Sequence, residues 1–372
     1  MAGEFCAAEW FEFIRMARSG FDVQARIQMN IIHFVRLTIT SAGYLGFALL
    51  GAEPGASPTS APATAGLRKK ALEVLAPIPQ QMPGAEKDTP GQIALGKRLF
   101  FEKRLSKNET QSCNTCHVVD QQRAGVDNEP TSIGAFGKRG GRNSPTVLNA
   151  GFHVAQFWDG RAENLEAQAK GPILNPIEMA MPNPSLVIER LSSDKAYLRQ
   201  FARAFPGETT PLNYDNLARA IAAFERTLVT HDRFDDFLNG QDKSLSAAEQ
   251  RGLQDFMTVG CTTCHNGPLI GGNGFKKFGI FESYLPDTDK GRVAVTKEEA
   301  DELVFKVPSL RNIAVTGPYF HDGRENSLES AIRRMGKIQL SVALSTDQVN
   351  DIAAYLKSLT GHGLKGKPLA AK

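Results

Sequence analysis

The chain has little excess charge of either sign. Its 372 residues include 43 Lys and Arg against 40 Asp and Glu, which leaves a formal net charge of +3. No basic stripe with interleaved aromatic residues occurs, which argues against nucleic acid as a partner. Hydrophobic residues make up 41% and charged residues 22%. This is an ordinary composition for a soluble protein, and the length allows two domains with cores of their own.

Long hydrophobic runs are also scarce. An uncharged apolar stretch covers residues 37–52, and a linker rich in Pro, Ala, Ser and Thr follows at residues 57–65. The apolar stretch is shorter than the about 20 residues that a membrane-spanning helix needs, and it suits an export signal that begins at Met29. We therefore predict that residues 1–66 are an extension, a signal or anchor segment and a linker. The signal is either cleaved or kept as a membrane anchor, and the remaining chain is exported to the periplasm.

Cysteine is rare, but its placement is informative. The chain has five cysteines. Four of them lie in two Cys-X-X-Cys-His motifs, formed by Cys113, Cys116 and His117 and by Cys261, Cys264 and His265. In this pattern the two thiols bond to the vinyl groups of a c-type haem, and the histidine binds the iron as its proximal ligand. The fifth cysteine, Cys6, lies in the N-terminal extension. We predict two covalently bound c-type haems.

Two other uses of paired cysteines fit the pattern less well. A structural zinc site can use two Cys-X-X-Cys pairs, but such pairs usually lie closer in sequence than Cys116 and Cys261. A zinc site would also not need a histidine after each pair. A thioredoxin-like dithiol needs a strand followed by a helix, and neither motif has that context.

No alternating strand pattern of useful length occurs, and apolar residues recur instead at helical intervals. The expected helices cover residues 67–75, 91–100, 184–205, 213–230, 246–259, 327–335 and 346–359. Ser246 and Glu249 form a capping-box pattern ahead of the second haem motif. The order helix, haem motif, loops and helices occurs twice. We predict a mainly α protein with two cytochrome c-like domains, residues 67–230 and 231–372, each with one covalently bound c-type haem.

The ligand opposite each proximal histidine decides what each haem can do, because a haem with Met and His ligands suits electron transfer whereas an open face can bind peroxide. Met335 is the only methionine after His265. We predict that it binds the second iron; packing in a helix core is the alternative. For the first haem the choice stays open between Met179, Met181, His153 and His231.

Several blocks of the sequence closely resemble bacterial di-haem cytochrome c peroxidases. They include LGKRLFFEKRLS, GRNSPTVLNAGFHVAQFWDGRAENLEAQAKGPI, AIAAFERTLVT, GCTTCHNGPLIGG and VPSLRNIAVTGPYFHDG, in order between about residues 67 and 362. The resemblance implies two cytochrome c-like domains with a calcium ion at their interface. It also implies reduction of hydrogen peroxide to water with electrons from a small periplasmic cytochrome c or cupredoxin, and membership of a family whose proteins often form homodimers.

The resemblance also implies roles for individual residues. The haem on His117 corresponds to the low-potential peroxidatic haem, and the haem on His265 corresponds to the high-potential haem where electrons enter. Met335 stands in the position of the distal ligand of the second haem. Glu178 corresponds to the acid-base residue at the peroxide site, and Trp158 corresponds to the tryptophan between the haems.

The implied calcium ligands are Asn143 and the carbonyl oxygens of Thr316 and Pro318. Hard oxygen ligands of this kind suit calcium. His321 lies in a matching block, and we expect it to be a hydrogen-bonded structural residue without a role in the chemistry.

One loop departs from the family pattern. Many members carry a histidine after the first motif that caps the peroxidatic iron, and here Ala135 occupies that position in residues 130–137. Alanine cannot bind iron. Either the first haem is open without reductive activation, which we favour, or another group such as His153 binds it.

This departure keeps two other functions open. One is a related di-haem oxidase that modifies tyrosine or tryptophan side chains of a partner protein, although such enzymes have Tyr where this chain has Met335. The other is a di-haem electron carrier without catalysis, against which Glu178 argues.

Overall fold

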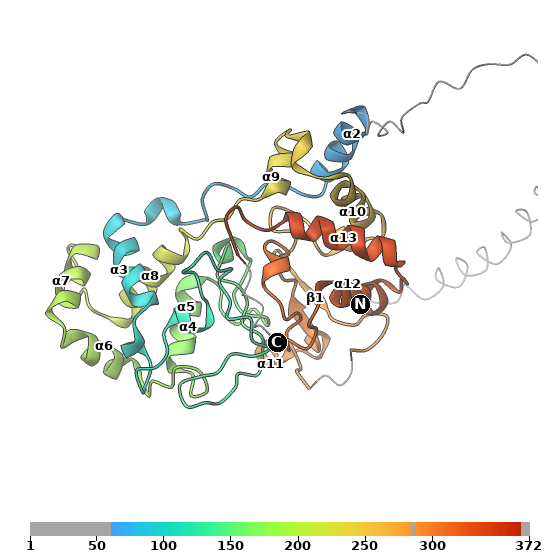
Figure 1. The fold of residues 1–372 in the computed structure, drawn as a ribbon. Helices are drawn as coiled ribbons and strands as arrows, with labels where there is room; N and C mark the ends of the chain where they lie inside the picture. The colour runs from blue at the N-terminus through green and yellow to red at the C-terminus, as the bar shows by residue number, and fades with distance from the viewer. Residues whose placement is uncertain (1–60, 285–287, 366–372) are drawn as a thin grey trace, which may run out of the picture. The chain divides into compact units, whose positions relative to one another are not determined.

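The computed structural model describes residues 61–284 and 288–365, and it is mainly helical (Figure 1), which confirms the predicted class. The helices are α2 (Ala61–Leu72), α3 (Pro90–Phe100), α4 (Cys113–Cys116), α5 (Leu165–Leu174), α6 (Pro184–Ser192), α7 (Lys195–Ala204), α8 (Tyr214–Glu225), α9 (Arg233–Leu238), α10 (Ala247–Thr258), α11 (Val293–Thr296), α12 (Leu328–Leu340) and α13 (Thr346–Ser358). Strands β1 (Phe275–Lys277) and β2 (Val304–Lys306) pair antiparallel.

The predicted export signal lies outside the described residues. Within them, the structure has no helix that is long and apolar enough to cross a membrane.

Most predicted helices are present, with one clear error. The capping box before α10 forms as expected: Ser246 N lies 2.8 Å from a Glu249 carboxylate oxygen, and Glu249 N lies 3.3 Å from Ser246 Oγ. The single helix predicted over residues 184–205 is wrong, because the chain forms α6 and α7 instead. Asp194 separates them, since its carboxylate accepts a hydrogen bond from Ala196 N at 2.8 Å and so caps a new helix.

Two hydrophobic clusters organise the described chain. The first is built by α3, α5, α6, α7 and α8. The second is built by α9, α10, α12 and α13, and α2 joins it through Ala71. Figure 1 shows the same grouping, with the blue helix α2 beside α9 and α10. The domain boundaries at residues 67–230 and 231–372 stay a prediction.

A glycine permits the central helix crossing in each cluster. A Cβ on Gly96 of α3 would lie 1.7 Å from Ala220 O of α8, and a Cβ on Gly252 of α10 would lie 1.8 Å from Asp351 O of α13. Any larger residue would push the helices apart, so the two helix pairs pack with their backbones in direct contact. Each haem motif follows the first helix of such a pair.

Candidate functional site

The first haem motif forms one helical turn. Helix α4 (Cys113–Cys116) puts the two thiols three residues apart, at the two ends of one turn, and His117 N donates to Cys113 O at 2.9 Å. Ser112 N donates to Thr115 Oγ1 at 2.9 Å, which starts the turn. The sequence therefore presents two sulfurs and one imidazole from a single short segment, as attachment to one porphyrin edge requires.

Cys113, Cys116, Cys261 and Cys264 form no disulfide, and each is partly buried. Burial raises the pKa of Cys116 to about 11 and that of Cys261 to about 12, and it also raises the pKa values of Cys113 and Cys264. Reactive dithiols need the opposite shift, because the thiolate is the nucleophile. These thiol pKa values therefore argue against a redox dithiol at either motif.

The imidazole of the second motif is held in one tautomer. His265 Nδ1 lies 3.1 Å from Ile270 O, and since a carbonyl only accepts, Nδ1 carries the proton and Nε2 keeps its lone pair. The ring faces a cavity and retains some exposed surface, but burial within the protein lowers the pKa of His265 to about 4. A neutral imidazole with a free Nε2 is the form that binds iron.

The loop that fixes His265 is itself anchored by a buried cation. Arg311 is 1% exposed, and its guanidinium lies 2.7 Å from Asp232 and 2.9 Å from Asp235. Its Nε donates to Pro268 O at 2.9 Å, two residues before the carbonyl that holds the imidazole. The ion pairs therefore position the proximal loop of the second motif.

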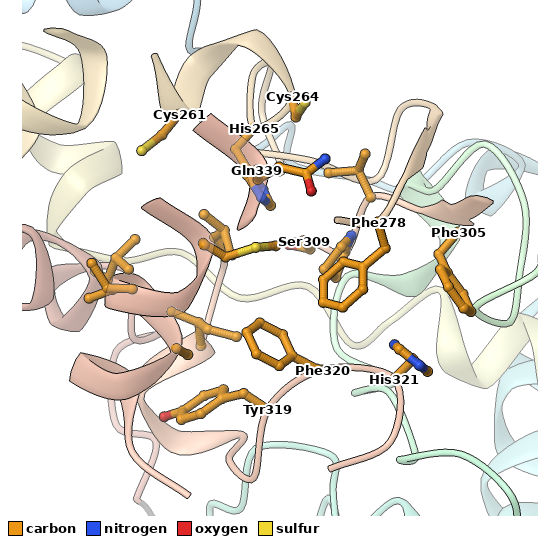
Figure 2. Close-up of a pocket in the computed structure, with 18 of the residues that line it drawn as sticks. Cys261, Cys264, His265, Phe278, Phe305, Ser309, Tyr319, Phe320, His321 and Gln339 are labelled. Carbon is orange, nitrogen blue, oxygen red and sulfur yellow. The ribbon is translucent and has the colours of Figure 1, made fainter. Parts of the chain in front are cut away.

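A large cavity lies beside His265. Its empty volume is about 1710 Å³, including the part open to solvent. Figure 2 shows the His265 ring beside Cys261 and Cys264, directed into the space that Phe278 borders. Helix α12 lines the cavity with one face, formed by Leu328, Ala331, Ile332, Met335, Gly336, Gln339 and Leu340. The structure thus brings Met335 and His265 to one cavity, and iron binding by Met335 stays a prediction.

This cavity fits a covalently bound haem. Its walls carry both thiols of one motif, an imidazole in the ligating tautomer and mostly apolar side chains. Within residues 61–284 and 288–365, no three or more His, Cys, Asp or Glu side chains converge as a metal-binding group. A zinc site built from the two cysteine pairs would need such convergence.

Near the first motif, Glu178 packs against the loop that carries Ala135. Ala135 N donates to Glu178 O at 2.7 Å, and the carboxylate accepts from Asn175 Nδ2 at 2.7 Å. Burial raises the pKa of Glu178, while Arg161 and the Asn175 amide oppose that rise. The Glu178 charge also raises the pKa of Cys116, so the carboxyl group lies near the first attachment site.

The first imidazole is also neutral. Burial lowers the pKa of His117, opposed by the charge of Asp127 and by the backbone of Gly125 and Pro145. Those backbone groups lie close, but His117 Nδ1 completes no hydrogen bond with any described residue. The surroundings of His117 therefore differ from those of His265, whose Nδ1 completes a hydrogen bond to Ile270 O.

The other candidate ligands for the first haem have different surroundings. Met179 and Met181 are buried in the first hydrophobic cluster. His231 Nδ1 lies 3.7 Å from Asp235, near the start of α9. His153 lines the cavity of the second motif, and its Nδ1 lies 2.8 Å from Lys306 Nζ. Binding to the first iron would require His153 to leave that hydrogen bond.

Trp158 lies on the wall of the same cavity. Its Nε1 donates to Asn143 O at 2.9 Å, and its carbonyl accepts from Lys306 N at 2.7 Å. His321 is 2% exposed and stacks on Phe305 with ring centroids 4.3 Å apart. Trp158 is therefore held at its indole N–H and at its backbone carbonyl, and His321 is packed among aromatic rings.

The predicted calcium ligands leave their oxygen atoms available. Asn143 N donates to His321 O at 2.7 Å, which joins its segment to the loop that carries Thr316 and Pro318. Asn128 Nδ2 supports that loop by donating to Val315 O at 3.0 Å and Gly317 O at 2.7 Å. Among the described residues, Asn143 Oδ1 and the carbonyl oxygens of Thr316 and Pro318 accept no hydrogen bond. Calcium binding by these three oxygens stays a prediction.

The sequence analysis did not single out two residues of this region, Lys306 and Arg311. Lys306 stands in the apolar run Val304–Pro308, and a lysine in such a run is a signal that was available. Arg311 gave no such signal, because its partners Asp232 and Asp235 lie far away in the sequence.

Comparison with known proteins gives a consistent picture. The family model described as di-haem cytochrome c peroxidase matches residues 90–243. Cytochrome c551 peroxidase of Pseudomonas aeruginosa is 47% identical over 302 residues, covering 79% of this chain and 86% of that protein. Cytochrome c551 peroxidase of Nitrosomonas europaea is 46% identical over 269 residues, covering 72% and 79%. A solved MauG-like protein associated with microbial copper homeostasis is 30% identical, with a TM-score of 0.69, and covers 77% of this chain and 94% of its own.

Proposed function

Because this chain belongs to the di-haem cytochrome c peroxidase family, we propose that it reduces hydrogen peroxide to water at the first haem, beside Glu178. The protein carries two c-type haems and is an oxidoreductase that acts on peroxide. Each peroxide consumes two electrons and two protons and yields two water molecules. The observation that carries the proposal is the half-buried carboxyl group of Glu178 next to the first attachment site.

Haem supplies the redox centre and the position where peroxide binds. The protein must move a proton from one peroxide oxygen to the other, and Glu178 is suited to that task as a general acid-base. Its pKa is raised by burial, which makes the carboxyl group a better proton acceptor than an exposed glutamate. The hydrogen bond from Asn175 holds the carboxylate in place.

The first haem is proposed to be open in the oxidised protein. Ala135 offers only a methyl group at the position where a ligand would be needed, and its backbone is tied to Glu178. His153 is engaged by Lys306. Peroxide would then react without prior reduction of the second haem.

The second haem is proposed to relay electrons between the donor and the first haem. His265 and Met335, which line one cavity, would hold its iron. Trp158, on the wall of that cavity, would couple the two centres. A calcium ion held by Asn143 Oδ1 and the carbonyl oxygens of Thr316 and Pro318 would join the two segments that carry these residues.

The cellular setting follows from the same family assignment. We propose that residues 1–66 direct export or anchor the protein, and that it works in the periplasm. The donor would be a small cytochrome c or cupredoxin. We also propose that the enzyme forms a homodimer, and its mass in solution tests this.

One other function has specific support. The similar MauG-like structure and the proposed open haem fit an oxidase that modifies a partner protein. The methionine at position 335, where those oxidases have tyrosine, favours the peroxidase.

One experiment separates these functions. The as-isolated, fully oxidised protein is mixed with hydrogen peroxide, and EPR and optical spectra are followed with and without a reduced small cytochrome c. An open peroxidase shows a high-spin first haem, an immediate reaction and catalytic oxidation of the donor. Two low-spin haems that do not react would contradict the proposal and indicate an electron carrier.

A further inference from the structure

Lys306 is a buried cation without an acidic partner. It is 4% exposed at the end of β2, and its Nζ lies 2.8 Å from His153 Nδ1. It forms no ion pair with any carboxylate of the described residues. Burying an ammonium group without a counter-ion is strongly unfavourable, so such groups are normally paired.

His153 adds a second buried donor that lacks an acceptor. The ammonium group has no lone pair, so it donates to Nδ1, and the imidazole proton must then lie on Nε2. His153 Nε2 is buried and has no hydrogen-bond partner among the described residues. Among the described side chains, Lys306 therefore lacks a counter-ion and His153 Nε2 lacks an acceptor.

The surrounding cavity is cationic. Among the described residues its lining includes Lys276, Lys277, Lys306 and Arg311, but no Asp or Glu. Arg311 is neutralised by Asp232 and Asp235, which lie outside the lining. Lys276 and Lys277 are exposed, so solvent screens them. Lys306 is left as the one lining cation that is both buried and unpaired.

We propose that Lys306 and His153 form a binding site for a carboxylate group in this cavity, and that its occupant is a propionate of the second haem. The cavity holds Cys261, Cys264 and His265, so this haem would bring its carboxylates into the cavity that the pair lines. The inference needs the bound haems but not the peroxide reaction. Lys306 acts as the counter-ion, and His153 positions it and donates a second hydrogen bond.

A fixed cation beside the second haem favours the reduced iron, which carries less positive charge. Lys306 should therefore help to raise the reduction potential of that haem. Lys306→Met keeps the length of the side chain and removes the charge. We expect the equilibrium constant for reduction of the second haem to fall at least tenfold, which is about 59 mV for a one-electron couple.

The test is spectroelectrochemical titration of both haems in purified di-haem protein. Lys306→Arg keeps the charge and should stay close to the wild type. Lys277→Met removes an exposed lysine from the same lining and should change neither potential. A shift confined to the second haem in Lys306→Met supports the proposal. Unchanged potentials, or a shift confined to the first haem, would overturn it.

Haem content is measured in every variant, because the charge can be needed for assembly. Loss of the second haem in Lys306→Met with retention in Lys306→Arg supports the counter-ion role. If both variants lose haem, resonance Raman spectra of the wild type decide. A propionate band that shifts in D₂O supports a bond from exchangeable Lys306 or His153 protons, and an insensitive band contradicts it.

Discussion

The two haem regions share the same support but differ on the side where a second ligand would bind. In each region two helices cross at a glycine, Gly96 in the first and Gly252 in the second. In each motif the histidine N–H also donates to the first cysteine carbonyl at 2.9 Å. The structural elements that hold the porphyrin are thus alike.

The differences concern the imidazole and its opposite face. His265 is oriented by Ile270 O and shares a cavity with Met335, whereas His117 Nδ1 completes no hydrogen bond in the described structure. The first region instead has Glu178, whose backbone carbonyl accepts from Ala135 N and whose carboxyl group raises the pKa of Cys116. In the proposed mechanism, one support therefore serves both electron transfer and peroxide chemistry, and a few residues opposite the histidine decide between them.

The largest expected effect comes from removing the acid-base group that distinguishes the first region. Glu178→Gln should lower peroxide turnover by about 10² to 10⁴-fold, because the proton transfer loses its catalyst while the shape is kept. Stopped-flow kinetics with hydrogen peroxide measure the rate, and pyridine haemochrome spectra confirm the haem content. The exposed Glu163 gives a matched control, and Glu163→Gln should react normally. A normal rate in Glu178→Gln would remove this residue from the mechanism.

The shared helix crossings can be tested as a pair. Gly96→Ala and Gly252→Ala should each lower the free energy of unfolding by about 1–3 kcal/mol, because the added Cβ collides with a facing carbonyl. Denaturant titration of the di-haem protein measures the loss. Gly66 of α2 has no atom near its Cβ position, so Gly66→Ala should be neutral or slightly stabilising. Very unequal costs for the two crossings would contradict a common support.

A histidine at position 135 should make the first region more like the second. In Ala135→His, the new imidazole would compete with peroxide for the first iron. If only about one tenth of the oxidised enzyme keeps an open first haem, its reaction with peroxide is about tenfold slower. EPR of the oxidised variant should show loss of the high-spin signal. The rate of reaction with peroxide is then measured again after reduction of the second haem, to test whether reduction restores it. Ala135→Val adds bulk without a ligand and should keep the high-spin signal.

The smallest effect concerns a buried acid found only beside the first motif. Burial raises the pKa of Glu225 from 4.5 to about 8, and its charge influences Cys113. Between pH 4.5 and about 8, Glu225 is ionised in the unfolded chain but stays protonated in the folded protein. The free energy of unfolding therefore falls as pH rises from about 4.5 through 8. Glu225→Gln should flatten that part of the pH–stability curve. A slope equal to that of the wild type would show that Glu225 does not titrate in this way.

Local patterns were sufficient for much of the architecture. The capping box at Ser246 and the two haem motifs act over a few residues, so their outcome can be predicted from sequence. The sequence analysis missed the break at Asp194. The helical pattern is otherwise continuous there, and the aspartate was not interpreted as a cap. Counting methionines after His265 was enough to suggest Met335 as its partner, but only the structure shows that the two residues line one cavity.

The remaining site features depend on contacts between distant segments. The Lys306–His153 hydrogen bond joins residues 153 positions apart, and Arg311 meets Asp232 across 79 positions. No periodicity records such pairs, since either residue alone looks like an ordinary polar side chain. A charged residue within an apolar run, as at Lys306, is the one local sign that a buried partner is needed.

The raised thiol pKa values bear on the order in which the protein is assembled. Thiol oxidation proceeds through the thiolate, so the buried thiols of the folded chain are slow to form disulfides even in an oxidising compartment. The same four cysteines have no such protection while the chain is unfolded. If the chain is exported as proposed, the interval between export and folding is when a reductant and haem would both have to reach Cys113, Cys116, Cys261 and Cys264.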